Sequence, residues 1–212
     1  MKKILPLSHG LRGEIEIPGD KSISHRSIIL SSLGNSTVEV SNFLAGEDCM
    51  STVSCMRALG AKIEQAGENF LITGCGLHEP ENILDAGNSG TTLRLLMGLL
   101  APQKFFTTFT GDDSLRRRPM ARVITPLKKM GASIFGRNDN KNLPITILPA
   151  EKKLRGITYE MPVASAQVKS ALLLAGLMPI IPRPSLSLRR LVTTRKKCWR
   201  HLEQGLKNLA TL

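Results

Sequence analysis

Alternating hydrophobic and polar residues predict a series of short strands and helices in the first third of the chain. Residues 13–18 alternate as a strand does, and the apolar spacing of 22–33 predicts a helix that Gly34 and Asn35 end. A second alternating run, at 37–41, predicts another strand. The pattern therefore begins as strand, helix, strand.

The next segment adds a helix and two strands. Glu47 and Asp48 open a helix that runs to about residue 59, and Gly60 suits the left-handed turn that ends many helices. Residues 61–65 and 70–73 then read as two strands around a polar turn. The complete order is βαβαββ.

The same pattern recurs further along the chain. Residues 127–134 resemble residues 56–63, and Gly131 and Gly60 stand at the same place before a strand. The two glycines lie 71 residues apart, which suits a whole supersecondary unit better than a short solenoid repeat. We infer a repeated α/β building block; a chance match of so few residues is the alternative.

The composition is that of an ordinary globular protein. The 212 residues are 42% hydrophobic and 22% charged, enough for one sizeable domain or two small ones. No apolar run approaches the roughly 20 residues that cross a bilayer, and the N-terminus lacks the features of a secretory signal. A cytoplasmic location without a membrane partner is therefore expected. The four cysteines have no metal-binding spacing, which favours reduced thiols and no metal site.

Positive charge is concentrated near the C-terminal end. Of the net charge of +12, residues 178–212 supply +7, from eight basic residues and Glu203, and the other 177 residues supply +5. A basic tail can bind nucleic acid through phosphates, but this one has a single aromatic residue, Trp199, and no recognition-module signature. Nucleic acid is therefore not an expected partner, and a basic binding arm stays a minor alternative.

Candidate chemistry begins at residues 19–26, between the first strand and the first helix. Lys21, Ser22 and Arg26 lie within six residues at the helix start, where free backbone N–H groups and the helix dipole favour an anion. This arrangement predicts a pocket for phosphate or carboxylate. The simpler alternative is a capped surface helix whose cations point into water.

A second polar cluster, residues 85–94, precedes the next apolar run. Its small residues let an anion approach the backbone, and Asn88 and Thr91 offer polar contacts at another helix start. The cluster matches neither G-x-x-x-x-G-K-[ST] nor G-x-G-x-x-G. Nucleotide binding is therefore disfavoured.

Two further clusters have the same character. Arg116, Arg117 and Arg118 precede Pro119, which suits the first turn of a helix. An arginine can hold phosphate or carboxylate through two hydrogen bonds, although one or two of these three are expected to be solvated only. The fourth cluster, residues 165–170, again places a hydroxyl and an amide at a helix start.

In this order the clusters resemble the motifs of the 5-enolpyruvylshikimate-3-phosphate (EPSP) synthase family. The resemblance is carried by residues 19–26, 87–94, 118–120 and 165–171, and it spans about residues 6–177. The last motif is similar to the family branch described as less sensitive to glyphosate. The resemblance implies one α/β domain of the enolpyruvyl transferase inverted barrel, built from repeated βαβαββ units with helices inside and sheets outside.

The resemblance also implies an activity, that of a 3-phosphoshikimate 1-carboxyvinyltransferase in the shikimate pathway to chorismate and aromatic amino acids. The 5-hydroxyl of shikimate 3-phosphate adds to C2 of phosphoenolpyruvate, and the adduct expels phosphate without a metal or cofactor. Lys21 would contact both substrates and assist proton transfer. The residues implied at shikimate 3-phosphate are Lys21, Ser22, Arg26, Ser165 and Gln167. Those implied at phosphoenolpyruvate are Lys21, Asn88, Gly90, Thr91, Arg118 and Gln167. Asp48 matches a family acid near the domain hinge, for which its place at a helix N-terminus is an adequate structural account.

The nearest enzymatic alternative is the sister family, UDP-N-acetylglucosamine enolpyruvyl transferase. That family has a cysteine in the loop corresponding to residues 111–118, where this chain has none. It also has Lys-Asn in its first motif, where this chain has Lys21 and Ser22. Both differences favour EPSP synthase.

The resemblance ends near residue 177. We expect residues 1–177 to form an N-terminal enolpyruvyl transferase domain, which could include the hinge near the N-terminus. Residues 178–212 are expected to be an aberrant basic tail read out of frame. If residues 178–182 are encoded by ATG CCG ATA ATC CC after a T, reading one base earlier gives Tyr-Ala-Asp-Asn-Pro, which resembles what the family shows there. The family's second domain, with its acid-base Asp and Glu, is expected to be absent.

Two classes of function follow from this interpretation. By its family the chain is a transferase, and it is expected to be truncated. It is expected to be inactive alone, because residues that act as a unit in catalysis do not contribute additively. A separately encoded second domain is a possible partner. Alternatively, the chain is a non-catalytic remnant that at most binds shikimate 3-phosphate.

Overall fold

In the part of the chain that the structure describes, four helices begin at a residue whose side chain accepts a hydrogen bond from the first turn. Asp20 accepts from the Ile23 N–H at 2.8 Å, and Ser89 accepts from the Thr92 N–H at 3.1 Å. Asp112 and Ser165 cap two later helices in the same way. Since such caps satisfy N–H groups that lack a partner inside the helix, these residues fix where each helix starts.

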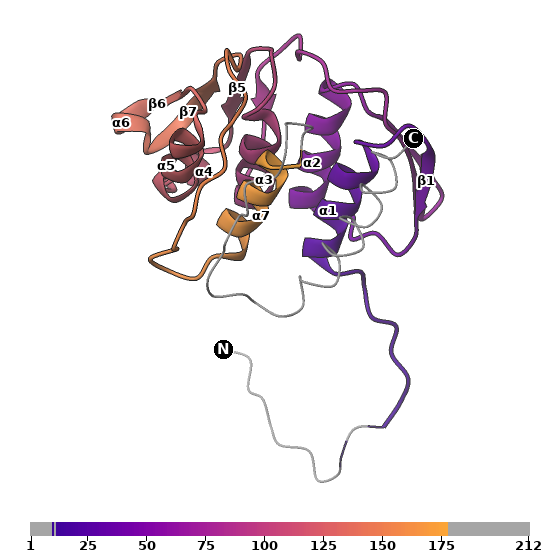
Figure 1. The fold of residues 1–212 in the computed structure, drawn as a ribbon. Coiled ribbons are helices and arrows are strands. Elements are labelled where there is room, and N and C mark those ends of the chain that lie inside the picture. Colours follow the sequence, from indigo (N-terminus) through magenta and orange to yellow (C-terminus); the bar gives the residue numbers. More distant parts are fainter. Residues whose placement is uncertain (1–9, 11, 178–212) are drawn as a thin grey trace.

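The computed structural model describes residues 10 and 12–177. In Figure 1, a group of helices lies between two sheets. The first unit consists of α1 (Lys21–Ser31), β1 (Thr37–Val40), α2 (Glu47–Ala58), β2 (Lys62–Ala66) and β3 (Asn69–Thr73). Its three strands form an antiparallel sheet in the order β1-β3-β2, with Ile63 opposite Ile72.

The second unit repeats this arrangement. It consists of β4 (Leu84–Asp85), α3 (Gly90–Leu100), β5 (Thr107–Thr110), α4 (Asp113–Arg117), α5 (Ala121–Met130), β6 (Ile134–Gly136), α6 (Arg137–Asn140) and β7 (Asn142–Ile147). The sheet order is β4-β5-β7-β6, so that β5-β7-β6 matches β1-β3-β2, and β4 runs parallel to β5. Gly60 and Gly131, at equivalent helix ends, have φ angles of 105° and 106°. The predicted repeat is therefore confirmed.

The centre of the described domain is α3, whose apolar side chains are all buried. The last described helix, α7 (Ala166–Ala175), packs against α3 so closely that a Cβ atom on Gly98 would lie 2.1 Å from the carbonyl oxygen of Ala171. With helices in the middle and sheets outside, the layers are those predicted (Figure 1).

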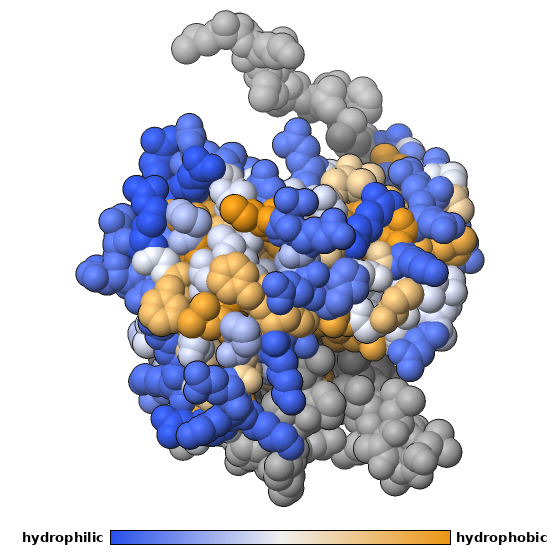
Figure 2. All heavy atoms as spheres, turned by 90° about the horizontal axis from the view of Figure 1, so that it is seen from above, coloured by the Kyte–Doolittle hydropathy of each residue, from blue (hydrophilic) through white to orange (hydrophobic). Residues whose placement is uncertain are grey.

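The hydrophobic side chains of both units meet in one core. Seen from above, the surface is mainly hydrophilic, with separate hydrophobic areas between the polar side chains (Figure 2). Within the described residues, no helix combines the length and the apolar character that crossing a membrane requires.

Two local predictions were wrong. Residues 13–18 form no strand, and Ile15 and Ile17 are 84% and 70% exposed. A strand needs a neighbour to bond its backbone, and none of the described strands pairs with this segment. Pro119 lies before α5 rather than in its first turn, because Met120 is the N-cap. The predictions for residues 1–9 and 178–212 lie outside the described residues.

Candidate active site

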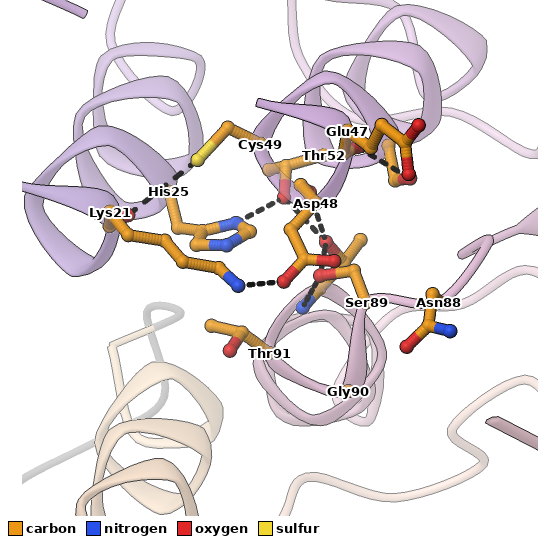
Figure 3. Close-up of polar contacts among 12 residues, drawn as sticks. Lys21, His25, Glu47, Asp48, Cys49, Thr52, Asn88, Ser89, Gly90 and Thr91 are labelled. Carbon is orange, nitrogen blue, oxygen red and sulfur yellow. Dashed lines mark hydrogen bonds and ion pairs between the residues drawn. The ribbon is translucent and has the colours of Figure 1, made fainter. Parts of the chain in front are cut away.

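The first part of the site is the start of α1, where Lys21 is the first helical residue. Its ammonium forms an ion pair with the carboxylate of Asp48, from the first turn of α2 (Figure 3). The Lys21 side chain is 52% exposed, and that of Asp48 is 25% exposed. Our sequence interpretation treated Asp48 as a helix N-terminal acid and missed this contact, since only the packing of α1 on α2 brings the pair together.

Arg26 connects α1 with α7. One of its guanidinium nitrogens donates to the Ser22 carbonyl at 2.5 Å, and another donates to the Ser170 hydroxyl at 3.4 Å. Ser22 and Arg26 are half-buried. The α1 residues expected at shikimate 3-phosphate therefore lie beside the helix that carries Ser165 and Gln167.

The Gln167 amide lies between two residues of α3. Its Oε1 accepts a hydrogen bond from Arg94 at 2.9 Å, and its Nε2 donates to the Thr91 hydroxyl at 2.9 Å. Arg94 also donates to the Gly90 carbonyl at 3.3 Å. We did not predict a role for Arg94, although it follows Gly90 by four residues and so shares its helix face. That spacing was the signal available in the sequence.

Arg118 and Asn88 form the third part of the site. The Arg118 guanidinium donates to Oδ1 of Asn88 at 2.5 Å and to the Ser114 hydroxyl at 3.3 Å. Asn88 in turn donates to the Asp112 carboxylate at 2.7 Å. The pKa of Asp112 lies below its ordinary value, mainly because the Leu115 N–H donates to its carboxylate. The hydrogen bond from Asn88 and the charge of Arg118 lower it further. These bonds fix the orientation of the Asn88 amide.

The electrostatics of this region favour an anion. Burial, followed by the nearby charges of Arg118 and Arg122, lowers the pKa of Arg94. Within the described part of the chain, neither Arg94 nor Arg118 has a carboxylate at ion-pair distance. Neighbouring guanidinium groups repel one another, so an anion between them relieves the repulsion. The described residues contain no group of three or more His, Cys, Asp or Glu side chains that could hold a metal ion.

A buried polar network connects the starts of α1, α2 and α3 beneath these residues (Figure 3). The His25 Nδ1 lies 2.6 Å from the Thr52 hydroxyl, which lies 2.6 Å from the Thr92 hydroxyl. Thr92 also donates to the Ser89 hydroxyl at 2.7 Å. His25 is fully buried, and its Nε2 has no hydrogen-bond partner among the described residues. Burial, followed by the charges of Lys21 and Arg26, lowers the pKa of His25 from 6.5 to about 4.

Contacts join many of the sequence-predicted residues, but not all of them. Gln167 meets Thr91 directly, Arg94 connects it with Gly90, and Arg118 meets Asn88. The Ser165 hydroxyl caps α7, and that of Ser22 makes no hydrogen bond to a described residue. Of the three consecutive arginines, only Arg118 contacts another predicted site residue; Arg116 and Arg117 line a different hollow.

These features define an α/β domain of repeated units whose helix starts form a cationic site, as in enolpyruvyl transferases. Residues 7–179 match the family model described as EPSP synthase (3-phosphoshikimate 1-carboxyvinyltransferase). The chain belongs to the EPSP synthase family, as its motifs predicted.

Curated relatives and solved structures agree with this assignment. The 3-phosphoshikimate 1-carboxyvinyltransferase of Thermoanaerobacter sp. (strain X514) is 57% identical over 169 residues, which are 79% of this chain and 39% of that protein. The enzyme of the same name from Alkaliphilus metalliredigens is 52% identical over 202 residues, covering 94% of this chain and 45% of that protein. EPSP synthase from Acinetobacter baumannii superposes with a TM-score of 0.75 at 42% identity, covering 82% of this chain and 41% of that one.

The chain thus spans about 40% of the length of the relatives that it matches. An alignment over 94% of 212 residues is longer than residues 1–177, so the Alkaliphilus alignment includes part of the segment 178–212. The change of reading frame stays a prediction, and the coding sequence tests it.

Proposed function

We propose that this chain supplies the shikimate 3-phosphate contacts and part of the phosphoenolpyruvate contacts of an EPSP synthase site. The observation that carries the proposal is the gathering of four cationic side chains: Lys21 and Arg26 on α1, Arg94 on α3 and Arg118 at the end of α4. Both substrates carry a phosphate and a carboxylate. Guanidinium, ammonium and free backbone N–H groups are the donors that such anions need.

In the proposed reaction, the 5-hydroxyl of shikimate 3-phosphate loses its proton as its oxygen bonds to C2 of phosphoenolpyruvate, while a proton is added at C3. The adduct then loses a proton from that methyl carbon, and its C2–O bond to phosphate breaks. Lys21 is the proposed catalytic residue of this chain, because its ammonium can both hold a phosphate and transfer a proton. The ion pair with Asp48 fixes the position of this ammonium.

The remaining roles divide between the two substrates. Ser22, Arg26 and Ser165 would hold shikimate 3-phosphate, and Asn88, Gly90, Thr91 and Arg118 would line the phosphoenolpyruvate side. Gln167 would contact both. Since Arg94 occupies its Oε1 and Thr91 takes one N–H of its Nε2, the second N–H is left to donate to a ligand.

The compartment and the source of the rest of the site are also proposals. Cys49, Cys55 and Cys75 are free thiols, which suits a reducing cytoplasm. The chain spans about 40% of the length of its relatives, and we propose that these 212 residues do not turn over substrates by themselves because groups from the rest of the relatives' length complete the site.

Binding of shikimate 3-phosphate, measured by titration calorimetry, tests the proposal. We expect the 212-residue chain to bind this ligand and the Arg26→Gln variant to bind it at least about tenfold more weakly, because a charge-assisted hydrogen bond is lost. The matched control is Lys62→Gln, which removes an exposed charge on β2. No binding by the unaltered chain, or equal binding by Arg26→Gln, would contradict the proposal.

Measuring phosphate release from phosphoenolpyruvate distinguishes a catalytic transferase from a non-catalytic remnant. We expect no turnover by the chain alone and recovery when the second domain of a family member is added. Turnover by the chain alone would show that no second domain is needed. Binding of shikimate 3-phosphate without recovery would favour a non-catalytic remnant.

Substitution of Gly90 tests the phosphoenolpyruvate side. A Cβ atom here would lie 2.6 Å from one guanidinium nitrogen of Arg94 and 3.4 Å from one of Arg118. Gly90→Ala should displace these flexible side chains while α3 stays intact. We expect affinity for phosphoenolpyruvate, measured with saturating shikimate 3-phosphate, to fall about tenfold. Gly34→Ala, whose Cβ meets nothing closer than 3.7 Å, is the control; an equal effect from both would refute this assignment.

A further inference from the structure

A second cationic region is formed by residues of α4, α6 and β7. Figure 1 labels these three elements. It is a hollow of about 490 Å³, within the size range of small-molecule sites. The hollow is lined by Asp113, Arg116, Arg117, Arg137, Asn138 and Asn142. None of these residues belongs to the site described above.

Its charge is unbalanced. Three guanidinium groups face one carboxylate, and Asp113 lies 3.9 Å from Arg116 while its own side chain is 84% exposed. Arg116 is held by a 3.2 Å hydrogen bond to the Thr110 hydroxyl. The guanidinium groups of Arg117 and Arg137 bond to no other described residue. The lining therefore carries a formal charge of +2. The guanidinium groups of Arg117 and Arg137 can each donate two hydrogen bonds to a phosphate.

Asparagine side chains fix the part of the hollow that α6 and β7 form. Asn142 donates to the Arg116 carbonyl at 3.0 Å and accepts from Asn138 at 3.1 Å, which connects β7 with both α4 and α6. The backbone of Asn138, Asp139 and Asn140 is left-handed, with φ of 50°, 53° and 65°. Asn and Asp tolerate this conformation better than other residues with a Cβ atom. The Asn140 side chain closes the turn by accepting from the Gly136 N–H at 2.9 Å.

We propose that this hollow binds a small anion with two linked phosphate groups, a function beyond the one proposed above. Arg117 and Arg137 would each hold one phosphate, Arg116 would bridge them, and the Asn138 amide would donate at the edge. No aromatic residue lines the hollow, so it offers no surface for stacking a nucleobase. The ligand chemistry is therefore that of pyrophosphate or a non-aromatic diphosphate ester.

Titration with pyrophosphate, followed by amide ¹H–¹⁵N NMR without divalent cations, tests this inference. We expect shift changes at Arg117 and at 137–142 that persist in Lys21→Ala, which weakens anion binding at the candidate active site. Arg117→Gln combined with Arg137→Gln should raise the dissociation constant at least about tenfold. The control, Lys152→Gln with Lys153→Gln, removes the same charge from an exposed loop and should leave it unchanged.

Three results would overturn the inference. One is an unchanged dissociation constant in the double arginine variant. Another is a set of shift changes confined to the surroundings of Lys21 and Arg118. The third is equal binding of sulfate at the same ionic strength, since a single tetrahedral anion cannot engage both unpaired arginines as a diphosphate does.

Discussion

Replacing Gly98 with alanine is expected to push α7 away from α3 and to lower the free energy of unfolding by about 2 kcal/mol. A Cβ atom at this position would lie 2.1 Å from the carbonyl oxygen of Ala171 and 2.6 Å from its Cα. Because both obstacles are backbone atoms, a helix must move. Such overpacking costs about 3 kcal/mol, of which alanine's better helix propensity recovers about 1 kcal/mol. The melting temperature should fall by about 4–8 °C.

The same displacement should weaken the candidate active site. Arg94 on α3 and Gln167 on α7 are bonded across this helix pair, so separating the helices breaks the bond. Affinity for shikimate 3-phosphate should therefore fall together with stability. Gly176→Ala is the matched control, because its Cβ would meet nothing closer than 3.6 Å in a right-handed backbone. If Gly98→Ala were as stable as Gly176→Ala, the two helices would not pack as closely as described.

The fold was predictable from the sequence where the signals are local. Gly60 and Gly131 mark equivalent helix ends, and both adopt the positive φ that glycine permits. Ser165 was expected at a helix start, and it caps α7. The strand expected at residues 13–18 failed because alternation shows only that a segment can be a strand. Whether it becomes one depends on a partner elsewhere in space.

The sequence predicted the residues of the candidate site better than it predicted the contacts between them. The motifs located Lys21, Asn88 and Gln167, each at or just before a helix start. Asp48 and Arg94 were missed because their contacts depend on which helices pack together. Residues that are adjacent in the sequence can also belong to different sites. Arg118 donates a hydrogen bond to Asn88, whereas Arg117 lines the second hollow. A run of like charges does not reveal this division.

Acidification below pH 6.5 should destabilise the protein through His25. Burial, followed by the charges of Lys21 and Arg26, lowers the pKa of its imidazole from 6.5 to about 4. Between these two pH values, His25 is protonated in the unfolded chain and neutral in the folded chain. The stabilising effect of neutral His25 is complete above pH 6.5 and is lost as the pH falls toward 4. The free energy of unfolding should decline by about 1.4 kcal/mol per pH unit, or about 3 kcal/mol in total.

Urea unfolding of the protein and of His25→Asn between pH 4 and 7 measures this effect. The Asn side chain can replace Nδ1 as the partner of Thr52 but does not titrate, so the variant should be less stable at pH 7 and should lack the His25 part of the slope. The depressed pKa of Asp112 affects stability only near and below its ordinary value of 3.8, outside most of this window. Equal slopes in both proteins would mean that imidazolium is accommodated beside Lys21 and Arg26. The neutral imidazole would then not be what keeps the starts of α1, α2 and α3 together.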